Sequence, residues 1–219
     1  MKILKVLKIV GIVIGSLFLL FVFLMTQPFV FIPHKHIVIS LPFAPSDDAT
    51  TGLIPMGEKI EHNASNGNPD GHGGIDFGFS KVTGIIAAAD GNINSVKKNS
   101  EGSYDVEEGC GLYKITYKEM NSVEKNIKWG TKVKQGDLLG YSGRTKQINE
   151  RPKPGDPSGQ IHWEFSSASM IIDRLCPVNY FDASAKARIE KIWDNVPSND
   201  RFKSEYPKIC NGVFDGKED

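Results

Sequence analysis

The strongest constraint on the fold is a series of short apolar stretches, separated by Gly, Asn and Asp, that runs from Gly52 to about Phe181. "LYKITY" (112–117) is rich in residues that favour strands, and "IHWEF" (161–165) alternates apolar and polar side chains. No long amphipathic helix interrupts this region. Many short strands joined by tight turns predict a mainly β protein, with an antiparallel β-sheet core over residues 52–181.

Turn residues predict two of the connections. "GIIAAADGNINSV" (84–96) indicates two strands joined as a hairpin at Asp90-Gly91, because this dipeptide favours the tight turn between paired strands. "VKQGDLLGYSG" (133–143) indicates a turn at Gly136-Asp137 followed by a short strand. A long polar segment rich in Pro and Gly, residues 142–160, precedes "IHWEF", and loops of this length are often functional.

A helix is predicted after the β region. Asp182 is a suitable N-cap for "ASAKARIEKIWDNV" (183–196), and Pro197 ends the pattern. We expect residues 182–219 to form a C-terminal helical appendage and tail that pack on the sheet. The apolar residues at helical spacing are Ile189, Ile192, Trp193 and Val196.

The N-terminus differs from the rest of the chain. "MKILKVLK" carries three lysines, and the next seventeen residues, 9–25, contain no charge. At about 1.5 Å per residue, this run is near the lower limit for crossing a bilayer as a helix. We expect an uncleaved transmembrane anchor over residues 1–28, with residues 9–25 in the membrane, and a linker rich in Pro, Ser and Asp over residues 29–51.

Because basic residues before a span stay cytoplasmic, the protein is expected in the cell membrane as a single-pass protein. Its main domain would then be extracytoplasmic, in the periplasm or at the cell surface. A cleaved signal peptide and a buried core helix are the alternatives. The run is long for a signal peptide, no A-x-A-like site follows it, and it is apolar on all sides.

Charge and cysteine content narrow the partners and the architecture. Lys and Arg number 26, Asp and Glu also number 26, and the basic residues are scattered, so nothing indicates a nucleic-acid partner. Three cysteines are too few for a disulfide scaffold. In an exported domain, Cys176 and Cys210 can form a bridge that ties down the tail, which would leave Cys110 free. The sequence alone leaves this pairing open.

"GHGGIDFGF" (71–79) carries the first candidate metal ligands, His72 and Asp76. The two glycines between them argue against a helix, and the second His of the helical H-E-x-x-H zinc motif is absent. Gly-Gly instead allows a tight backbone path that brings both side chains to one point. Taken alone the pair is weak evidence for a metal. The other N-terminal histidines, His34, His36 and His62, are interpreted as surface residues.

His162 strengthens the metal hypothesis. In a strand, Gln160, His162 and Glu164 point to one face, while Ile161, Trp163 and Phe165 point to the other and fill the core. Two imidazoles and one carboxylate, with a fourth position open to water, are the ligand set of a catalytic zinc site. Such an ion lowers the pKa of its bound water to about 7 and polarises a carbonyl, as amide hydrolysis requires.

The motifs around these residues resemble those of the lysostaphin-type (LytM-like) zinc metallopeptidase family. "HGGIDFGFSKVTGIIAAADGNI" is similar to the family's H-x-G-x-D motif and its following A-x-D-G-x-V/I strand, with Gly91 fifteen residues after Asp76. "VKQGDLLGYSG" resembles its VKKGQxIGxxG hairpin, "IHWEF" its LHFE strand, and "CPVNYF" its closing xxPxxY turn. The resemblance covers roughly residues 52–181.

This resemblance implies a split β-barrel or two-layer β-sheet core and one zinc ion bound by His72, Asp76 and His162. It also implies a role at the bacterial cell wall, because most family members are endopeptidases that cut peptide cross-bridges in peptidoglycan. Some relatives are inactive and regulate other wall hydrolases.

The chain departs from the family at both histidines that are not zinc ligands. The family's closing H-x-H motif has Gln160 in place of its first His, and the segment that holds the family's Y-x-H strand has no His at all. Gln160 can still donate a hydrogen bond to an oxyanion, but it cannot transfer a proton. Glu164 or Glu119 is then the candidate proton carrier, and the alternative for Glu164 is a residue that orients a ligand.

The leading hypothesis is therefore a membrane-anchored zinc metalloendopeptidase that acts on peptidoglycan peptide cross-links through zinc-activated water. The alternative keeps the fold and the zinc but not the hydrolysis: a zinc-binding module that binds cell wall or regulates another wall hydrolase. A zinc-stabilised structural domain with no wall role is a third hypothesis.

Overall fold

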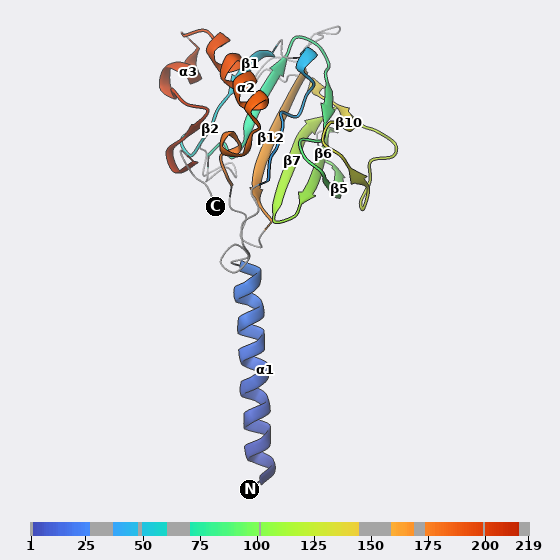
Figure 1. Ribbon diagram of the computed structural model, residues 1–219, viewed down its shortest axis with the longest axis vertical. Coiled ribbons are helices and arrows are strands. Elements are labelled where there is room, and N and C mark those ends of the chain that lie inside the picture. Colours follow the sequence, from blue (N-terminus) through green and yellow to red (C-terminus); the bar gives the residue numbers. More distant parts are fainter. Residues whose placement is uncertain are drawn as a thin grey trace.

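The computed structural model describes residues 2–26, 37–47, 50–60, 71–100, 102–144, 159–168, 174–198 and 200–214. Its centre is a large antiparallel sheet with the strand order β1-β3-β12-β7-β6-β5-β9, to which β11 adds by pairing with β12 (Figure 1). The strands are β1 (Thr50–Ile54), β3 (Ile75–Phe79), β12 (Gly159–Ser167), β7 (Tyr113–Met120), β6 (Tyr104–Cys110), β5 (Gly91–Lys98), β9 (Lys132–Val133) and β11 (Gly143–Arg144).

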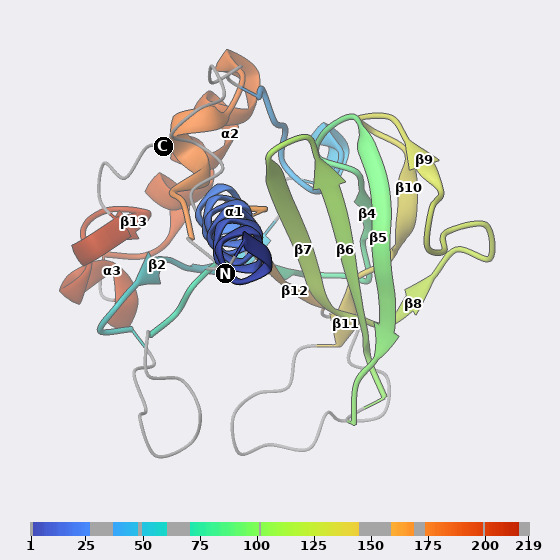
Figure 2. The same cartoon turned by 90° about the horizontal axis from the view of Figure 1, so that it is seen from below.

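Two smaller sheets complete the β structure. One has three antiparallel strands in the order β4-β10-β8, and in the other β13 pairs with β2 in parallel (Figure 2). The large sheet and the three-stranded sheet confirm the expected mainly β, antiparallel core, and the β2–β13 pair is a parallel addition. The strands are β4 (Gly84–Ile86), β10 (Leu138–Tyr141), β8 (Ser122–Val123), β2 (Met56–Gly57) and β13 (Cys210–Asn211).

The predicted hairpin at Asp90-Gly91 is wrong, although both of its strands exist. β4 pairs with β10 in the small sheet, whereas β5 pairs with β6 and β9 in the large one. Between them the chain crosses from one sheet to the other through Ala87, Ala88 and Ala89, all buried. Ala87 exchanges backbone hydrogen bonds with the predicted turn at Gly136-Asp137, so the crossing segment is held by tertiary pairing.

Part of the predicted linker over residues 29–51 belongs to the core. Ile39, Leu41 and Phe43 are fully buried. Phe43 packs edge-on against Phe77 and Phe79 of β3, with ring centroids 5.1 Å apart in both pairs. It also forms a bridge with Ile85 of β4, so it joins the large and small sheets. Burial of these apolar side chains explains why residues 37–43 pack rather than extend.

The predicted C-terminal helix is confirmed as α2 (Ala183–Asn195), and the Asp182 side chain accepts a hydrogen bond from the Ala185 N–H at 2.7 Å. Its predicted apolar face is buried, and Figure 1 shows the helix beside β1. The tail adds a short helix, α3 (Arg201–Glu205), and β13. Cys176 and Cys210 form a disulfide, as the sequence allowed, and Cys110 is buried and free.

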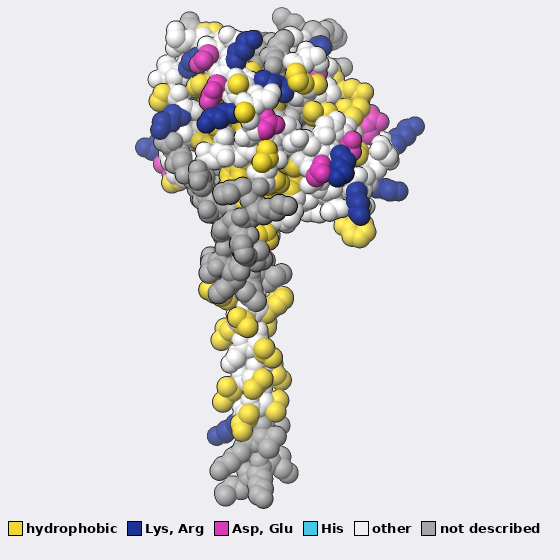
Figure 3. Space-filling view, in the orientation of Figure 1, with side chains coloured by type: hydrophobic (Ala, Val, Ile, Leu, Met, Phe, Trp, Pro, Cys, Tyr) yellow, Lys and Arg dark blue, Asp and Glu magenta, His cyan; other side chains and the backbone are white. Residues whose placement is uncertain are grey.

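The N-terminal apolar run lies in a helix, α1 (Lys2–Thr26), drawn apart from the β domain in Figure 1. Large apolar side chains on its described part are exposed, as Figure 3 shows. Judged by length and hydropathy together, no helix in the described part of the chain qualifies as a membrane span. His34, His36, His62 and most of the polar segment 142–160 lie outside the described residues.

The carboxyl group of Glu108, on β6 of the large sheet, is fully buried. The Tyr117 hydroxyl donates to Glu108 Oε2 at 2.6 Å and accepts from the Ala88 N–H at 2.7 Å. Burial raises the pKa of Glu108 from 4.5 to about 7, against the lowering effect of hydrogen bonds that include the one from Tyr117. Because the folded state holds this proton more tightly, its contribution to stability is complete below pH 4.5 and is lost as the pH rises to about 7.

We therefore expect Glu108→Gln to raise the unfolding temperature above pH 7 and to bring no such gain below pH 4.5, because the amide is never charged. Thermal unfolding followed by circular dichroism across this pH range measures the difference. Glu107→Gln, on the half-buried neighbour that pairs with Lys114, is the control and should show no such pH dependence. A gain from Glu108→Gln that is equal at all pH values would contradict the assignment.

Candidate metal centre

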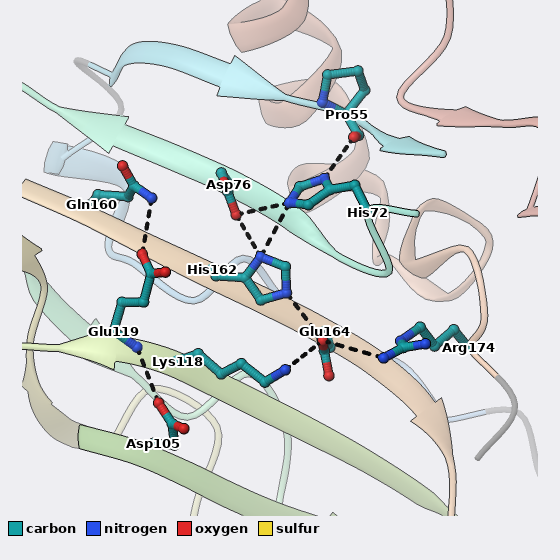
Figure 4. Close-up of polar contacts among 10 residues, drawn as sticks. All are labelled: Pro55, His72, Asp76, Asp105, Lys118, Glu119, Gln160, His162, Glu164 and Arg174. Carbon is teal, nitrogen blue, oxygen red and sulfur yellow. Dashed lines mark hydrogen bonds and ion pairs between the residues drawn. The ribbon is translucent and has the colours of Figure 1, made fainter. Parts of the chain in front are cut away.

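Three predicted ligands converge at the junction of β3 and β12 (Figure 4). In the register of these strands, Asp76 lies directly opposite His162, and His72 lies four residues before Asp76. His72 Nε2 lies 3.1 Å from Asp76 Oδ1 and 3.1 Å from His162 Nδ1, while His162 Nδ1 lies 2.6 Å from Asp76 Oδ1. Within the described part of the chain, these three side chains form a cluster whose ligand atoms all lie within 4.8 Å of one another, close enough to hold one metal ion.

The triangle of ligand atoms fits a small tetrahedral ion. With Zn–N and Zn–O bonds of about 2.0 to 2.1 Å, neighbouring ligands of a tetrahedral zinc lie about 3.3 Å apart. Two of the three separations, both 3.1 Å, are close to this value. The third, 2.6 Å between His162 and Asp76, is a hydrogen-bond distance that has to lengthen by about 0.7 Å when an ion replaces the proton. Two imidazoles and a carboxylate are also a ligand set that zinc accepts.

His72 is held in the required orientation by β2. Its backbone exchanges hydrogen bonds with Gly57, and its ring Nδ1 lies 2.8 Å from the Pro55 carbonyl oxygen. A carbonyl only accepts, so Nδ1 carries the proton of the neutral ring and Nε2 presents its lone pair to the other ligands. β2 in turn pairs with β13, where Met56 N–H donates to the Ile209 carbonyl.

Glu164 orients the second imidazole. Its Oε1 lies 3.0 Å from His162 Nε2, on the side of the ring away from Asp76, so Nε2–H donates to the carboxylate and Nδ1 is left to face the ligands. Lys118 Nζ donates to the same oxygen at 2.7 Å, and Arg174 lies 3.9 Å from it. Figure 4 shows these cations on either side of Glu164. A carboxylate behind a ligating His is the usual arrangement in zinc proteins.

Gly74 makes the close approach of the two strands possible. A Cβ atom at this position would lie 2.5 Å from the Trp163 carbonyl oxygen and 2.9 Å from both Glu164 Cγ and His162 Nε2. The backbone oxygen cannot move aside as a flexible side chain can, so only glycine fits here. The expectation that His72 and Asp76 meet at one point is confirmed, and Gly74 lets the segment between them pack against β12.

Gly91 has a similar structural role. A Cβ atom there would lie 2.7 Å from the Gly109 carbonyl oxygen and 2.9 Å from the Glu108 carboxylate. This glycine lets β5 pass close to β6 over the buried carboxyl group. Its spacing from Asp76 therefore reflects packing of the sheet and not contact with the metal ligands.

The charges of the cluster are strongly coupled. Burial raises the pKa of Asp76, but contacts with His162 and His72 outweigh it and hold the pKa well below its usual range. Burial lowers the pKa of His162, but hydrogen bonds to Asp76 and Glu164 raise it to about 9. Burial likewise raises the pKa of Glu164, and His162 and Lys118 bring it down to about 2. Without an ion, His162 is thus a cation between two carboxylates at neutral pH.

Gln160 lies on the same strand face as His162 and is half-buried, as the alternation of β12 predicted. Its Nε2 donates to Glu119 Oε2 at 2.9 Å, which brings Glu119 beside it. Glu119 is the one described residue other than glycine with a left-handed backbone, with φ at 64°. Such a conformation costs about 1 kcal/mol or more and is often found at functional sites. The two proton-carrier candidates therefore have different surroundings: Glu164 is behind a ligand and Glu119 is next to Gln160.

Sequence reasoning missed the residues that support the ligands. Pro55 acts through its backbone carbonyl, for which no sequence signal exists. Lys118 could have been placed on the polar face of its strand, because it alternates with the buried Tyr117, but the pairing of β7 with β12 was not predicted. Arg174 follows "IHWEF" at a distance that no periodicity fixes.

Zinc affinity should depend on the proton that His162 holds. Nδ1 must lose its proton before it can bind the ion, so the apparent affinity should rise roughly tenfold per pH unit between pH 7 and about 9 and level off above. Titration calorimetry with zinc in buffers of different ionisation enthalpy should detect about one proton released from the site at pH 7. An affinity that is independent of pH would contradict this protonation state.

Glu164→Ala should weaken zinc binding by roughly 10- to 100-fold, because His162 loses the carboxylate that fixes its ring. Glu164→Gln, which keeps a hydrogen-bond acceptor, should fall between this variant and the wild type. Glu107→Ala removes a carboxylate from a neighbouring pair with Lys114 and serves as the control. Competition with a chromophoric chelator measures the affinities. Equal affinities for Glu164→Ala and the wild type would show that Glu164 does not support the ligand.

Comparison with solved structures finds partial similarities, with TM-scores below 0.5. Csd3 from Helicobacter pylori is 16% identical with a TM-score of 0.49, and the alignment covers 78% of this chain and 44% of that one. A zinc-containing peptidase from Vibrio cholerae is 18% identical with a TM-score of 0.43, covering 57% and 35%. The catalytic domain of EnpA from Enterococcus faecalis is 20% identical with a TM-score of 0.40, covering 58% and 90%. The chain thus spans less than half the length of the first two. No curated protein matches the sequence.

The sequence itself matches a family model. Residues 70–173 match the model of Peptidase family M23, and this range contains His72, Asp76 and His162 together with the close-packed Gly74. The positions that depart from the expected pattern, such as Gln160, lie within the same range. The match confirms the resemblance predicted from the motifs: residues 70–173, just under half of the chain, are similar to Peptidase family M23.

Proposed function

We propose that the protein is a zinc metalloendopeptidase of the cell wall, with His72, Asp76 and His162 as the zinc ligands and peptidoglycan peptides as substrate. The observation that carries the proposal is the triangle of ligand atoms, in which both imidazoles are oriented by a second contact: Pro55 behind His72 and Glu164 behind His162. A zinc ion bound there would polarise a peptide carbonyl and acidify a water. The M23 family match supports peptides as the substrate class.

Gln160 and Glu119 are the residues of this chain suited to act on the substrate. The Gln160 amide can donate to the oxygen of the scissile carbonyl as negative charge develops on it. Glu119 can take the proton of the attacking water and pass it to the leaving amine, which is the part that a histidine plays in other family members. Their mutual hydrogen bond keeps the two groups together. Glu164 is assigned to positioning, because its contacting oxygen bonds His162 Nε2 and Lys118.

A membrane anchor is part of the proposal. Residues 9–25 would lie in the bilayer with Lys2, Lys5 and Lys8 on the cytoplasmic side, and the β domain would lie outside the cytoplasm. The exposed apolar side chains of α1 support this placement, because they need a lipid or protein environment. The Cys176–Cys210 disulfide supports it as well, since disulfides persist in oxidising compartments.

A regulatory module that binds zinc and wall but does not hydrolyse is the second candidate. Gln160, a neutral amide at a position where the family has a histidine, favours it. In this case the same site would recognise a wall peptide or a wall-hydrolase partner. The two functions differ in one measurable respect, namely whether zinc-loaded protein releases soluble fragments from murein.

We expect the purified full-length protein to bind one zinc ion and to release soluble peptides from murein slowly. Asp76→Ala should lose both properties, because it removes a ligand. Glu119→Gln should keep the zinc and lose about 10²- to 10⁴-fold in rate, the usual cost of losing acid-base catalysis. Glu190→Gln, on the exposed face of α2, is the control and should match the wild type.

Zinc analysis by mass spectrometry and murein release followed by chromatography separate the outcomes. Wild-type protein without zinc would refute the ligand assignment. Zinc-loaded protein without any release would refute the peptidase and leave the regulatory module. Unchanged activity in Glu119→Gln would assign proton transfer to another residue.

A further inference from the structure

Trp129 is unusually exposed. It lies in the loop between β8 and β9, which stands out from the side of the domain in Figures 1 and 2. Its side chain is 79% exposed, whereas Trp163 is fully buried and Trp193 is 7% exposed. No hydrogen bond or ring contact within the described residues involves its indole. An indole is one of the largest apolar groups in a protein, so its exposure needs an explanation.

The loop that carries Trp129 is built as a firm support. The Ile127 N–H donates to the Glu124 carbonyl at 2.9 Å, and the Thr131 hydroxyl donates to the Asn126 carbonyl at 2.9 Å. The loop is also tied to β5, since the Gly130 N–H donates to the Ile93 carbonyl and the Ile93 N–H donates to the Thr131 carbonyl, both at 2.8 Å. Ile127 is buried beneath it. Because the loop backbone is already fixed by these hydrogen bonds, little conformational entropy is lost when Trp129 binds a partner.

The surroundings of Trp129 are basic. Lys125, Lys128 and Lys132 are exposed, and none has an ion-pair partner among the described residues. Lys134 is different, because it bonds Asp90 at 2.7 Å and its charge is compensated. Figure 3 shows several Lys and Arg side chains on this side of the domain. The loop therefore presents one indole together with three lysines and one carboxylate, Glu124, so its net charge is positive.

We propose that this loop, residues 124–132, docks onto the surface of an anionic lipid bilayer. Indole rings prefer the headgroup region, where their apolar body and their N–H are both accommodated. Lysines beside them are attracted to anionic headgroups. A sugar-binding surface would surround the indole mainly with neutral or acidic hydrogen-bonding groups, whereas here the exposed charges in the loop are mostly those of lysines. The combination of ring and charges matches a membrane surface best.

The length of the chain before the domain supports this partner. Ten residues, 27–36, separate the end of α1 from Ile37, where the packed domain begins. Fully extended, they reach at most about 35 Å. If residues 9–25 are anchored as proposed above, the domain cannot leave the membrane surface by more than this distance. The contact then forms within one molecule at high effective concentration, and a weak interaction is sufficient.

Docking through this loop would leave the metal centre open. The loop is attached at β5 and β9, at one edge of the large sheet, whereas the ligands lie on β3 and β12. β12 and β5 are separated by three strand spacings, about 14 Å at 4.8 Å each. The bilayer would thus fix the orientation of the domain without covering His72, Asp76 and His162.

The test uses the full-length chain in lipid nanodiscs made of phosphatidylcholine alone or mixed with phosphatidylglycerol. Acrylamide quenching of tryptophan fluorescence reports mainly Trp129, because Trp163 and Trp193 are buried. We expect quenching to fall at least twofold in the anionic discs. Trp129→Phe should remove the lipid-dependent part of the signal. The triple variant Lys125→Gln, Lys128→Gln and Lys132→Gln should be quenched equally in both discs.

A matched control neutralises three exposed lysines elsewhere and should behave as the wild type: Lys59→Gln, Lys186→Gln and Lys191→Gln. Equal quenching of the wild type in both discs overturns the docking proposal. Protection by soluble polyglycerol phosphate, without any effect of the lipid, also overturns it in favour of a polymer site. A chain that does not remain with the discs on size-exclusion chromatography refutes the anchor, and with it the tethered docking. None of these readouts requires zinc or hydrolysis, so they are independent of the peptidase assignment.

Discussion

The pairing of β3 with β12 is the interaction on which the rest of the molecule depends. It puts Asp76 opposite His162, and a shift of β12 by one residue would turn His162 to the face away from Asp76. The same register buries Phe77 and Trp163 on the core side of the sheet. Hydrophobic burial and metal-site geometry therefore select the same alignment of the two strands. The free energy that fixes the ligands comes mostly from the core, and the polar cluster is carried on its opposite face.

This arrangement lets the core hold a group of charges that would otherwise be costly. Asp76, His162, Glu164 and Lys118 alternate in sign, and each is within hydrogen-bond distance of the next. Buried ionised groups are tolerated when each is paired in this way. Removal of one member leaves its neighbour unpaired, so the members act as a unit. Asp76 and His162 Nδ1 would hold an ion in place of the proton they share, and the ion would supply the positive charge beside Asp76.

Much of the site was predictable because it depends on local periodicity. The alternation of "QIHWEF" sets the face of His162, and the glycines after His72 allow the close approach to Asp76. The supports of these ligands were not predictable, because Pro55, Lys118 and Arg174 reach the site through strand pairing between distant segments. The failed hairpin at Asp90-Gly91 has the same cause. A turn dipeptide specifies a local bend, but which sheet each strand joins is decided by tertiary contacts such as those of Ala87.

The strand pair β2–β13 links the metal centre to a distant part of the chain. β2 supports His72 through Gly57 and Pro55, while β13, beside it, begins at a cysteine that is covalently joined to Cys176. The support of the first ligand thus includes residues far downstream in the sequence. A chain that lacks these residues, or in which the two cysteines are reduced, would lack part of the structure that borders His72.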